Sequence, residues 1–524
     1  ERLKGIKVNA YAIIMLILFS LNLYMYAKGA FSYPYLEDDD SWGHAEGVKY
    51  IAVEKNVFSD ATKHVRYVNP YPPTYDLLMG ILHQTNDSVY WTLKFFNALV
   101  VSLSIIFFYF FVKEFSGSRN KALFAAFALA SIPAFLSHFI WALALSVPLF
   151  FVVFYATEMI KHDWRWFIVA GLSMFTVLTS SPTHSTYFGL FFVLYLLTKM
   201  GLERKFLAWD AAAGALGLAL SFLIWWLPML LRHGFERTIQ GLGFRIGYIK
   251  EYGLGTALRG TGDRIYTFKD FFIAQKQNMI NNPIGIGIFL SILTIIAVVF
   301  LLIMFKELIK KENHWLAITF VWFAFTLYAV NAAKFAIKLS PFRAWMLLAI
   351  PVCILAAQGA FFLMDFSKKF LGNFGKYAML LILLVGIYFT STQQKIAVNT
   401  SPTWPPGGFW TSNEEIAAYI WMREQLQPNA KVFGFVIDGP IIGNDKFICY
   451  WCEDIIEFRK TAINMTASEI SSFLKNRGYE YVIIDGQIVK EYGAEKANAK
   501  VQEFADSGLF TPAYQNQGAI IFKI

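Results

Sequence analysis

Four consecutive acidic residues, Glu37 to Asp40, follow the first apolar stretch of the chain. Carboxylates this close to a bilayer are costly unless they are solvated, paired or bound to a metal. Such a cluster could supply a base to an acceptor, or hold a divalent cation that organises a phosphate leaving group. Asp38, Asp39 and Asp40 are therefore the candidate catalytic residues. Asp40 is also the candidate ligand for Mg²⁺ or Mn²⁺ if the reaction needs a metal, and the alternative is a solvated acidic turn.

Basic residues that could complement these acids lie on loops predicted at the same membrane face. Lys334, Lys338 and Arg343 flank one loop, and Arg237 lies with further arginines in the long stretch 232–283. An acidic site facing a cationic rim suits a phosphorylated lipid head group. The alternative is that these side chains extend toward lipid phosphates in general.

Two histidines are weaker substrate-binding candidates. His44 follows Asp40 by one helical turn, and His138 lies near a predicted outer helix end. A lone histidine at a helix end is more often a hydrogen-bonded interfacial residue than a ligand or base. The sequence lacks a nucleotide-binding phosphate loop, a serine-hydrolase elbow and a His-Glu-x-x-His zinc motif, which argues against those three chemistries.

The elements that must position these residues are membrane helices. Hydrophobic residues make up 56% of the 524 residues and charged residues only 16%, too apolar a composition for one water-soluble core. We expect a polytopic α-helical protein with about 11 to 13 spanning helices. The apolar stretches on which this depends are Ala10–Ala27, Leu93–Val112, Ala211–Leu231, Ile284–Phe305, Trp315–Val330, Ala344–Met364 and Tyr377–Thr390.

Short basic loops predict the orientation of the chain in the plasma membrane. Their lysines and arginines account for the net charge of +9 without any nucleic acid, and the positive-inside rule places them in the cytoplasm with the N-terminus. An odd number of crossings then places the C-terminal domain outside. We predict a membrane domain over residues 1–392, with long outer loops at about 28–91 and 232–283, and a soluble extracytoplasmic domain over residues 393–524.

The C-terminal segment reads as a soluble α/β domain after a linker rich in proline and glycine at 402–408. The predicted helices are 413–426, 467–476 and 494–506, and the predicted strands are 432–437, 481–484 and 519–524. Cys449 and Cys452 form a lone Cys-x-x-Cys, which could be a redox pair, half of a metal site or an extracytoplasmic disulfide. No second pair is present, so a structural zinc is disfavoured.

One segment, Asp40-Ser-Trp-Gly-His-Ala-Glu-Gly-Val-Lys-Tyr-Ile51, resembles a known family. An aspartate in the first outer loop, shortly before Ala-Glu-Gly at the start of a helix, is similar to the catalytic subunits of oligosaccharyltransferases. These belong to the GT-C class of membrane glycosyltransferases. The segment Asn69-Pro-Tyr-Pro-Pro-Thr-Tyr75 and the plan of long first loop, helices, second long loop and outer domain are also similar to that class.

The resemblance implies a GT-C fold and transfer of a sugar or glycan from a polyprenyl carrier, such as dolichol phosphate or diphosphate. The acceptor would be a protein or glycan on the extracytoplasmic side, and an archaeal source is preferred. Asp40 then matches the first-loop catalytic aspartate, with Glu46 in the neighbouring Ala-Glu-Gly. Arg343 matches the arginine that contacts the carrier phosphate. Asp438, in Val436-Ile-Asp-Gly-Pro440, matches the aspartate of the Trp-Trp-Asp motif.

The sequence departs from oligosaccharyltransferases at three places. Segment 136–148 has no second acidic pair, Trp-Trp-Asp has become Val-Ile-Asp, and the second-loop motif is only Thr238-Ile-Gln-Gly241. Many GT-C enzymes with single-sugar donors work without a metal, and a chain that lacks the second acidic pair fits their mechanism at least as well. The alternatives are a divergent, metal-dependent oligosaccharyltransferase, a transporter of lipid-linked sugars and a scaffold subunit without activity.

Overall fold

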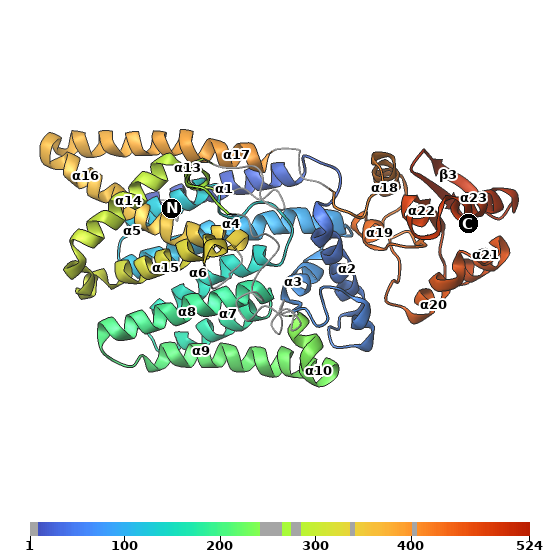
Figure 1. Ribbon diagram of the computed structural model, residues 1–524, viewed down its shortest axis with the longest axis horizontal. Helices are drawn as coiled ribbons and strands as arrows, with labels where there is room; N and C mark the ends of the chain where they lie inside the picture. Colours follow the sequence, from blue (N-terminus) through green and yellow to red (C-terminus); the bar gives the residue numbers. More distant parts are fainter. Residues whose placement is uncertain (1–8, 242–264, 274–283, 336–340, 401–405) are drawn as a thin grey trace, which may run out of the picture. The chain divides into compact units, whose positions relative to one another are not determined.

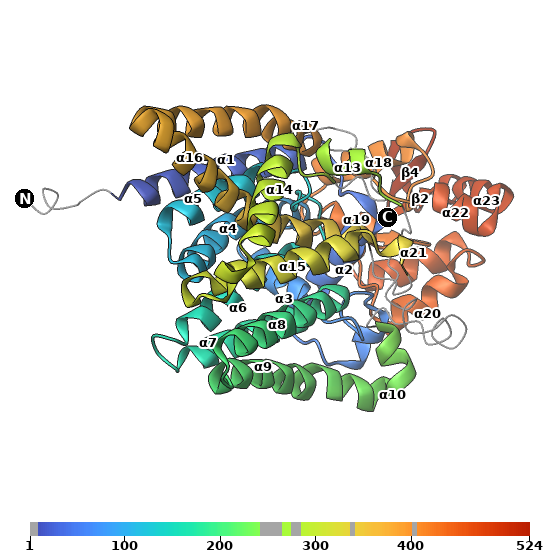
Figure 2. The ribbon, with the colours of Figure 1, turned by 60° about the vertical axis from the view of Figure 1, so that its left-hand side comes forward.

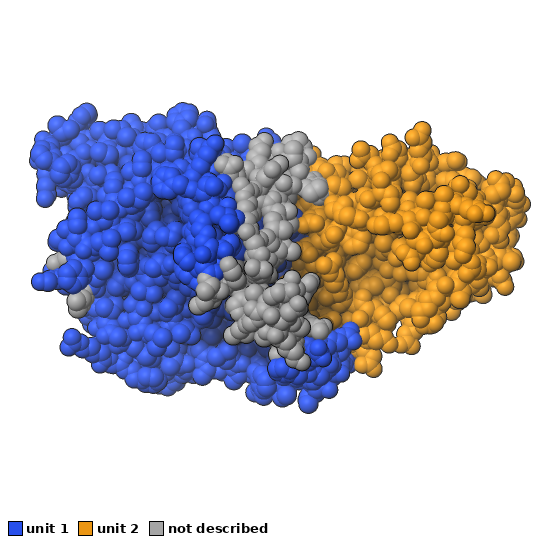
Figure 3. Space-filling view, viewed as in Figure 1, with its two compact units in different colours: residues 1–30, 98–401 blue, residues 31–97, 402–524 orange. Residues whose placement is uncertain are grey.

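A computed structural model describes residues 9–241, 265–273, 284–335, 341–400 and 406–524. The chain forms two compact units (Figure 3). Unit 1 contains residues 1–30 and 98–401, and unit 2 contains residues 31–97 and 402–524. This division differs from the predicted boundary at 392/393, because the first loop groups with the C-terminal segment.

Unit 1 is built from apolar helices (Figures 1 and 2). They are α1 (Ala10–Ala30), α4 (Val89–Ser116), α5 (Arg119–Ser131), α6 (Leu143–Met159), α7 (Trp166–Leu178), α8 (Pro182–Glu203), α9 (Ala208–Ser221), α10 (Leu227–Gly241), α13 (Phe268–Phe272), α14 (Ile288–Ile303), α15 (His314–Val330), α16 (Pro341–Ile387) and α17 (Gln393–Asn399). The first residues of α4 belong to unit 2. Trp322 of α15 lies at the core of this unit and donates a hydrogen bond from its indole nitrogen to the carbonyl oxygen of Phe191 at 3.0 Å.

Six helices among the described residues are long and apolar enough to cross a membrane. They are Ala10–Ala30, Val89–Ser116, Pro182–Glu203, Ala208–Thr238, Lys311–Val330 and Pro341–Asn399. The last segment bends at Gly372, whose backbone has φ 61° and ψ −151°, so it has two arms. Shorter apolar helices are α6, α7 and α14. The prediction of a polytopic helical membrane protein is confirmed.

Unit 2 combines the first loop with a small α/β domain. The first loop contributes α2 (Asp38–Glu54) and α3 (Thr74–His83). The C-terminal segment contributes α18 (Asn413–Gln425), β1 (Val432–Gly434), α19 (Gly439–Gly443), α20 (Glu453–Ala462), α21 (Ala467–Asn476), β2 (Tyr481–Asp485), α22 (Gly486–Tyr492), α23 (Ala494–Asp506), β3 (Thr511–Gln515) and β4 (Ala519–Lys523). The strand order is β1-β2-β4-β3, with β1 and β2 parallel and the other pairs antiparallel. The predicted α/β domain is confirmed, and β3 was not predicted.

Helix α2 packs against α3 and α19, and two glycines allow the close approach. A Cβ atom at Gly47 would lie 2.1 Å from the Oδ2 atom of Asp76 on α3. A Cβ atom at Gly443 on α19 would lie 2.6 Å from the ring of Trp42 on α2. Both positions therefore require glycine, and the contacts fix α2 within unit 2.

Candidate functional site

The acidic turn begins α2, and its first two aspartates are used to shape the backbone. Asp38 has a positive φ of 54°, and its side chain accepts a hydrogen bond from the backbone nitrogen of Asp39 at 2.7 Å. Burial raises the pKa of Asp38, and the neighbouring negative charges of Asp40 and Asp39 raise it further. Asp39 accepts a hydrogen bond from the backbone nitrogen of Gly408 at 2.7 Å. Asp38 therefore shapes the turn at the start of α2, and Asp39 joins the first loop to the linker.

Asp40 has a different environment from its two neighbours. Its Oδ1 atom accepts a hydrogen bond from the phenol of Tyr67, and the guanidinium of Arg66 lies 3.9 Å from the same oxygen. The side chain is 36% exposed and that of Arg66 is 57% exposed. Burial, together with the negative charge of Asp40, raises the pKa of Tyr67, so the phenol remains a donor at neutral pH. The carboxylate of Asp40 is thus oriented by a donor while a substrate can still reach it.

His44 and Asp76 form a buried pair, and the ring of His44 packs against Tyr67. The ring of His44 stacks on Tyr67 with centroids 4.3 Å apart, and its Nδ1 atom lies 2.6 Å from the Oδ1 atom of Asp76. Both members of the pair are at most 2% exposed. Tyr75 packs edge-on against His44 and donates a hydrogen bond to Asn97 at 2.9 Å. His44 is therefore positioned to hold the tyrosine that binds Asp40, and it is too buried to bind substrate directly.

Glu46 and Asp438 lie where α2 packs against α19. Glu46 accepts a hydrogen bond from the backbone nitrogen of Gly439. Burial, with a contribution from the charge of Asp438, raises the pKa of Glu46 to about 8. Asp438 forms a two-point ion pair with Arg459, one oxygen accepting from Nη1 at 2.8 Å and the other from Nη2. The charge of Asp438 is therefore compensated within unit 2.

The two cysteines of the Cys-x-x-Cys motif are joined in unit 2. Cys449 and Cys452 form a disulfide in the segment between α19 and α20. Of the three predicted uses of this pair, the structure contains the disulfide. Cys353, on α16 in unit 1, is free and buried.

Arg343 and His184 lie in the first turns of two helices of unit 1. Arg343 is in the first turn of α16, and its Nε atom is buried without a hydrogen-bond partner among the described residues. His184, in the first turn of α8, is fully buried, and its Nε2 atom also has no partner in that part of the chain. The positive charge of Arg343 acts on the ring of His184. A buried guanidinium nitrogen without an acceptor indicates a place for a bound anion.

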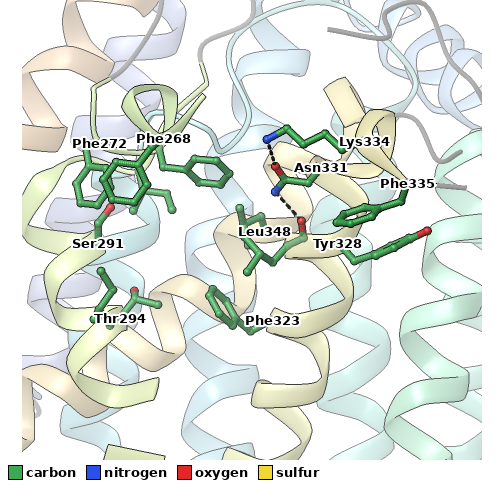
Figure 4. A pocket seen from close by; sticks show the side chains of 14 residues that line it. Phe268, Phe272, Ser291, Thr294, Phe323, Tyr328, Asn331, Lys334, Phe335 and Leu348 are labelled. Carbon is green, nitrogen blue, oxygen red and sulfur yellow. Dashed lines mark hydrogen bonds between the residues drawn. The ribbon is translucent and has the colours of Figure 1, made fainter. Parts of the chain in front are cut away.

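A cavity of about 580 Å³ in unit 1 has mostly apolar walls (Figure 4). It is lined by residues of α13, α14, α15 and α16, among them Phe268, Phe272, Phe323 and Leu348. Lys334 lies at this cavity and donates hydrogen bonds to Asn331 at 3.1 Å and to the carbonyl oxygen of Tyr266 at 2.9 Å. A long apolar chain with an anionic end suits such a cavity.

Three other predicted substrate-binding residues are not part of the sites described above. His138 is fully buried in unit 1, 2.7 Å from where a Cβ atom at Gly29 would lie, so it packs beneath α1. Arg237 is an exposed residue of α10. Lys338 falls outside the described residues.

The described residues do not fit a metal site. Asp40 meets a phenol and a guanidinium rather than further carboxylates or imidazoles. Across the described ranges, no three His, Cys, Asp or Glu side chains are grouped closely enough to hold an ion. We therefore derive no step through a metal.

The chain matches known proteins in three-dimensional structure but not in amino-acid sequence. No protein-family model and no curated protein matches the chain. The apo crystal structure of the Archaeoglobus fulgidus oligosaccharyltransferase matches with a TM-score of 0.55 and 14% identity, over 98% of this chain and 74% of that one. ArnT from Cupriavidus metallidurans, bound to undecaprenyl phosphate, matches with a TM-score of 0.50 and 12% identity, over 98% and 97%. The fold is GT-C.

A second archaeal structure relates the GT-C fold to ligands. AglB from Archaeoglobus fulgidus, in complex with an inhibitory peptide and a dolichol-phosphate, matches with a TM-score of 0.54 and 13% identity, over 91% of this chain and 69% of that one. At such identities the similarity shows the fold alone. The roles of individual residues in this GT-C chain must be argued from its own geometry.

Four residues near Asp40 and Arg343 were not predicted from the sequence. Tyr67, Arg66 and Asp76 lie in the same long loop as Asp40, yet nothing periodic links them to it. His184 is identified only by its burial and its unpartnered nitrogen. In the sequence, the only indication for His184 was its position near the outer end of a predicted helix.

Proposed function

We propose that the protein is an integral-membrane glycosyltransferase that moves a sugar from a polyprenyl-phosphate carrier to an acceptor on the extracytoplasmic face. The main support is the geometry at Asp40, a part-exposed carboxylate oriented by Tyr67 at the start of α2. A general base must be accessible to substrate and held in a defined direction. The GT-C fold adds support, since its matches include proteins bound to dolichol-phosphate and undecaprenyl phosphate.

The proposed reaction is a displacement at the anomeric carbon of the donor. A nucleophilic group of the acceptor forms the new bond to this carbon, and its proton passes to the carboxylate of Asp40. The bond between the anomeric carbon and the phosphate oxygen breaks, and polyprenyl phosphate leaves with the bonding electron pair. The base contributes through proton transfer, commonly worth 10²- to 10⁴-fold in rate.

Arg343 and His184 are proposed to bind the phosphate of the carrier. Both present buried nitrogens that lack partners among the described residues, and one of them always carries positive charge. Binding here would stabilise the negative charge that develops on the leaving phosphate. The apolar cavity beside Lys334 is proposed to receive the first units of the polyprenyl chain.

A divergent oligosaccharyltransferase is the second candidate, favoured by the match to the archaeal enzyme. Two observations on unit 2 weigh against it. Asp438 is bound to Arg459 instead of being open to an acceptor, and the described residues form no metal cluster. Inhibition of transfer by a chelator would favour this candidate over a metal-independent enzyme.

The orientation of the chain is part of the proposal. Unit 2 is proposed to lie outside the plasma membrane, with the N-terminus in the cytoplasm. In intact cells, a membrane-impermeant maleimide should label Cys449 and Cys452 only after a mild reductant is added. Their substitution by serine is the control, and labelling only after permeabilisation would contradict this orientation.

The function is tested by a transfer assay in nanodiscs, with a polyprenyl-linked sugar pool extracted from the native membrane. Asp40→Asn should lower transfer by at least 100-fold. Asp60→Asn, which makes the same charge change at an exposed position of the same loop, should leave it unchanged. Both variants are assayed with and without EDTA. Full activity of Asp40→Asn would refute the assignment of the base.

A further inference from the structure

A second large groove opens on unit 1, away from the residues assigned above. It has a volume of about 730 Å³, within the range usual for ligand sites, and lies between α1, α5 and the two arms of α16. Figure 2 shows α1 running along the second arm of α16. The apolar walls include Ile14, Leu18, Phe124, Phe127, Leu380 and Leu384.

The groove exists because the helices at its sides are only partly covered by protein. On α1, Leu16 and Leu21 are 61% and 60% exposed. Leu381, on the second arm of α16, is 62% exposed, and Phe389, just after the end of α16, is 58% exposed. Large apolar side chains of this kind would be unstable in water, but these helices are membrane spans. Hydrocarbon chains of lipids are therefore the solvent that fills the groove.

One end of the groove carries a cation and an amide. Lys376 and Asn120 are the lining residues there, next to the bend at Gly372. Lys376 is partly exposed and forms no ion pair with a carboxylate of the described residues. The other lining residues are apolar apart from Tyr377 and Tyr388. The site thus pairs a long apolar channel with a positive charge at one end.

The opposite side of α1 repeats this arrangement on a smaller scale. A cavity of about 150 Å³ there is lined by Met15, Ile106 and Phe110, and it ends at Lys113 and Arg119. Lys113 and Arg119 belong to a basic segment that the positive-inside rule assigns to the cytoplasm. Anionic head groups attract basic residues just outside a spanning helix.

We propose that the groove between α1, α5 and α16 is a binding site for an anionic phospholipid of the cytoplasmic leaflet. One acyl chain lies along the apolar wall, and the phosphate is bound by Lys376 with Asn120 as a hydrogen-bond donor. The lipid fills the space between α1 and the second arm of α16 and so holds α1 against the rest of unit 1. This site does not depend on the proposed transferase activity.

The binding is tested with full-length protein in nanodiscs that contain phosphatidylglycerol and phosphatidylcholine in equal amounts. Native mass spectrometry after release counts the retained lipids, and a phosphatidylglycerol with a diazirine in its acyl chain locates them. We expect preferential retention of phosphatidylglycerol and cross-links to peptides spanning 120–127 and 376–389. Equal retention of the two lipids, or cross-links confined to other helices, would overturn the proposal.

Two variants and one competitor sharpen the test. Lys376→Gln should reduce the preference for phosphatidylglycerol about fivefold, the effect of losing one basic residue near an anionic surface. Lys369→Gln removes an exposed charge from the same bend without touching the groove, and it should change nothing. Equal effects of the two variants would refute a specific site. Displacement of the bound lipid by undecaprenyl phosphate would refute a phospholipid occupant and assign the groove to the carrier.

Discussion

Replacing Glu46 by glutamine tests the electrostatics of the candidate site without altering its shape. Burial and the charge of Asp438 raise the pKa of Glu46 to about 8, against the opposing effects of Arg66 and Arg459. The folded protein therefore binds a proton at Glu46 that the unfolded chain releases near pH 4.5. Its contribution to stability is fully present below pH 4.5 and is lost as the pH rises to about 8.

The change in pKa sets how much stability is lost between these pH values. One pKa unit corresponds to about 1.4 kcal/mol, so raising the pKa of Glu46 from 4.5 to about 8 lowers the free energy of unfolding by at most about 5 kcal/mol. The Glu46 side chain is partly exposed, and water reduces the expected loss to roughly 1–2 kcal/mol. At about 2–4 °C per kcal/mol, Glu46→Gln should melt about 2–8 °C above wild type at pH 8. The difference should be smaller at pH 5.

The assay is differential scanning fluorimetry in detergent at pH 5, 6.5 and 8. Glutamine cannot ionise, and it keeps an oxygen that accepts the hydrogen bond from Gly439. Glu457→Gln, at a side chain 70% exposed, is the matched control and should show no such trend. A Glu46→Gln variant that melts at the same offset from wild type at all three pH values would refute the reasoning. Because Glu46 is mostly neutral at pH 7, the variant should also retain transfer within about twofold.

Three further changes probe the site. Tyr67→Phe removes the donor to Asp40 and should lower kcat about tenfold with the KM for the donor unchanged, and an unchanged kcat would contradict the role of the phenol. Asp76→Asn breaks the buried pair with His44 and should lower the free energy of unfolding, measured with denaturant, by about 3–5 kcal/mol. The double variant with His44→Gln should lose clearly less stability than the sum of the losses of the two single variants. Arg343→Lys loses the planar guanidinium, so kcat/KM for the carrier-linked donor should fall about 10- to 100-fold, and a variant with wild-type kcat/KM would remove Arg343 from the phosphate site.

Much of the fold could be predicted because its signals are local. Apolar stretches of helical length predicted the membrane spans, and α21 was predicted to the residue, beginning at the capping box of Thr466 and Glu469. The strand β3 was missed because Thr511–Gln515 is an exposed edge strand that contains a proline and has no apolar alternation. Its existence depends on pairing with β4, which no local pattern records.

The division into units could not be predicted, because it depends on contacts between distant segments. The indole nitrogen of Trp42 donates to the carbonyl oxygen of Pro406 at 2.8 Å, across 364 residues. Asp39 and Gly408 meet in the same way. Such pairings follow from the packed structure and not from periodicity, so the first loop was assigned to the membrane domain instead of to unit 2.

Residue type alone supplied the candidates for the site, and their roles stay predictions. Four adjacent acids mark Asp40, but the sequence ranks Asp38, Asp39 and Asp40 equally. The structure separates them, since the first two are engaged by backbone nitrogens and the third is held by Tyr67. The partner lies 27 residues away, a spacing with no recognisable pattern.

The carboxyl groups gathered around α2 differ in whether each could act as a base. Asp438 is compensated by two nitrogens of Arg459, so using its charge would require breaking a two-point ion pair. Glu46 is mostly protonated at neutral pH and has a donor, Gly439, to satisfy it. Asp40 is exposed by about a third, and Arg66 stays 3.9 Å away. Because a base must be reachable and oriented at once, the contacts single out Asp40 among these three, although the sequence placed all of them in the same site.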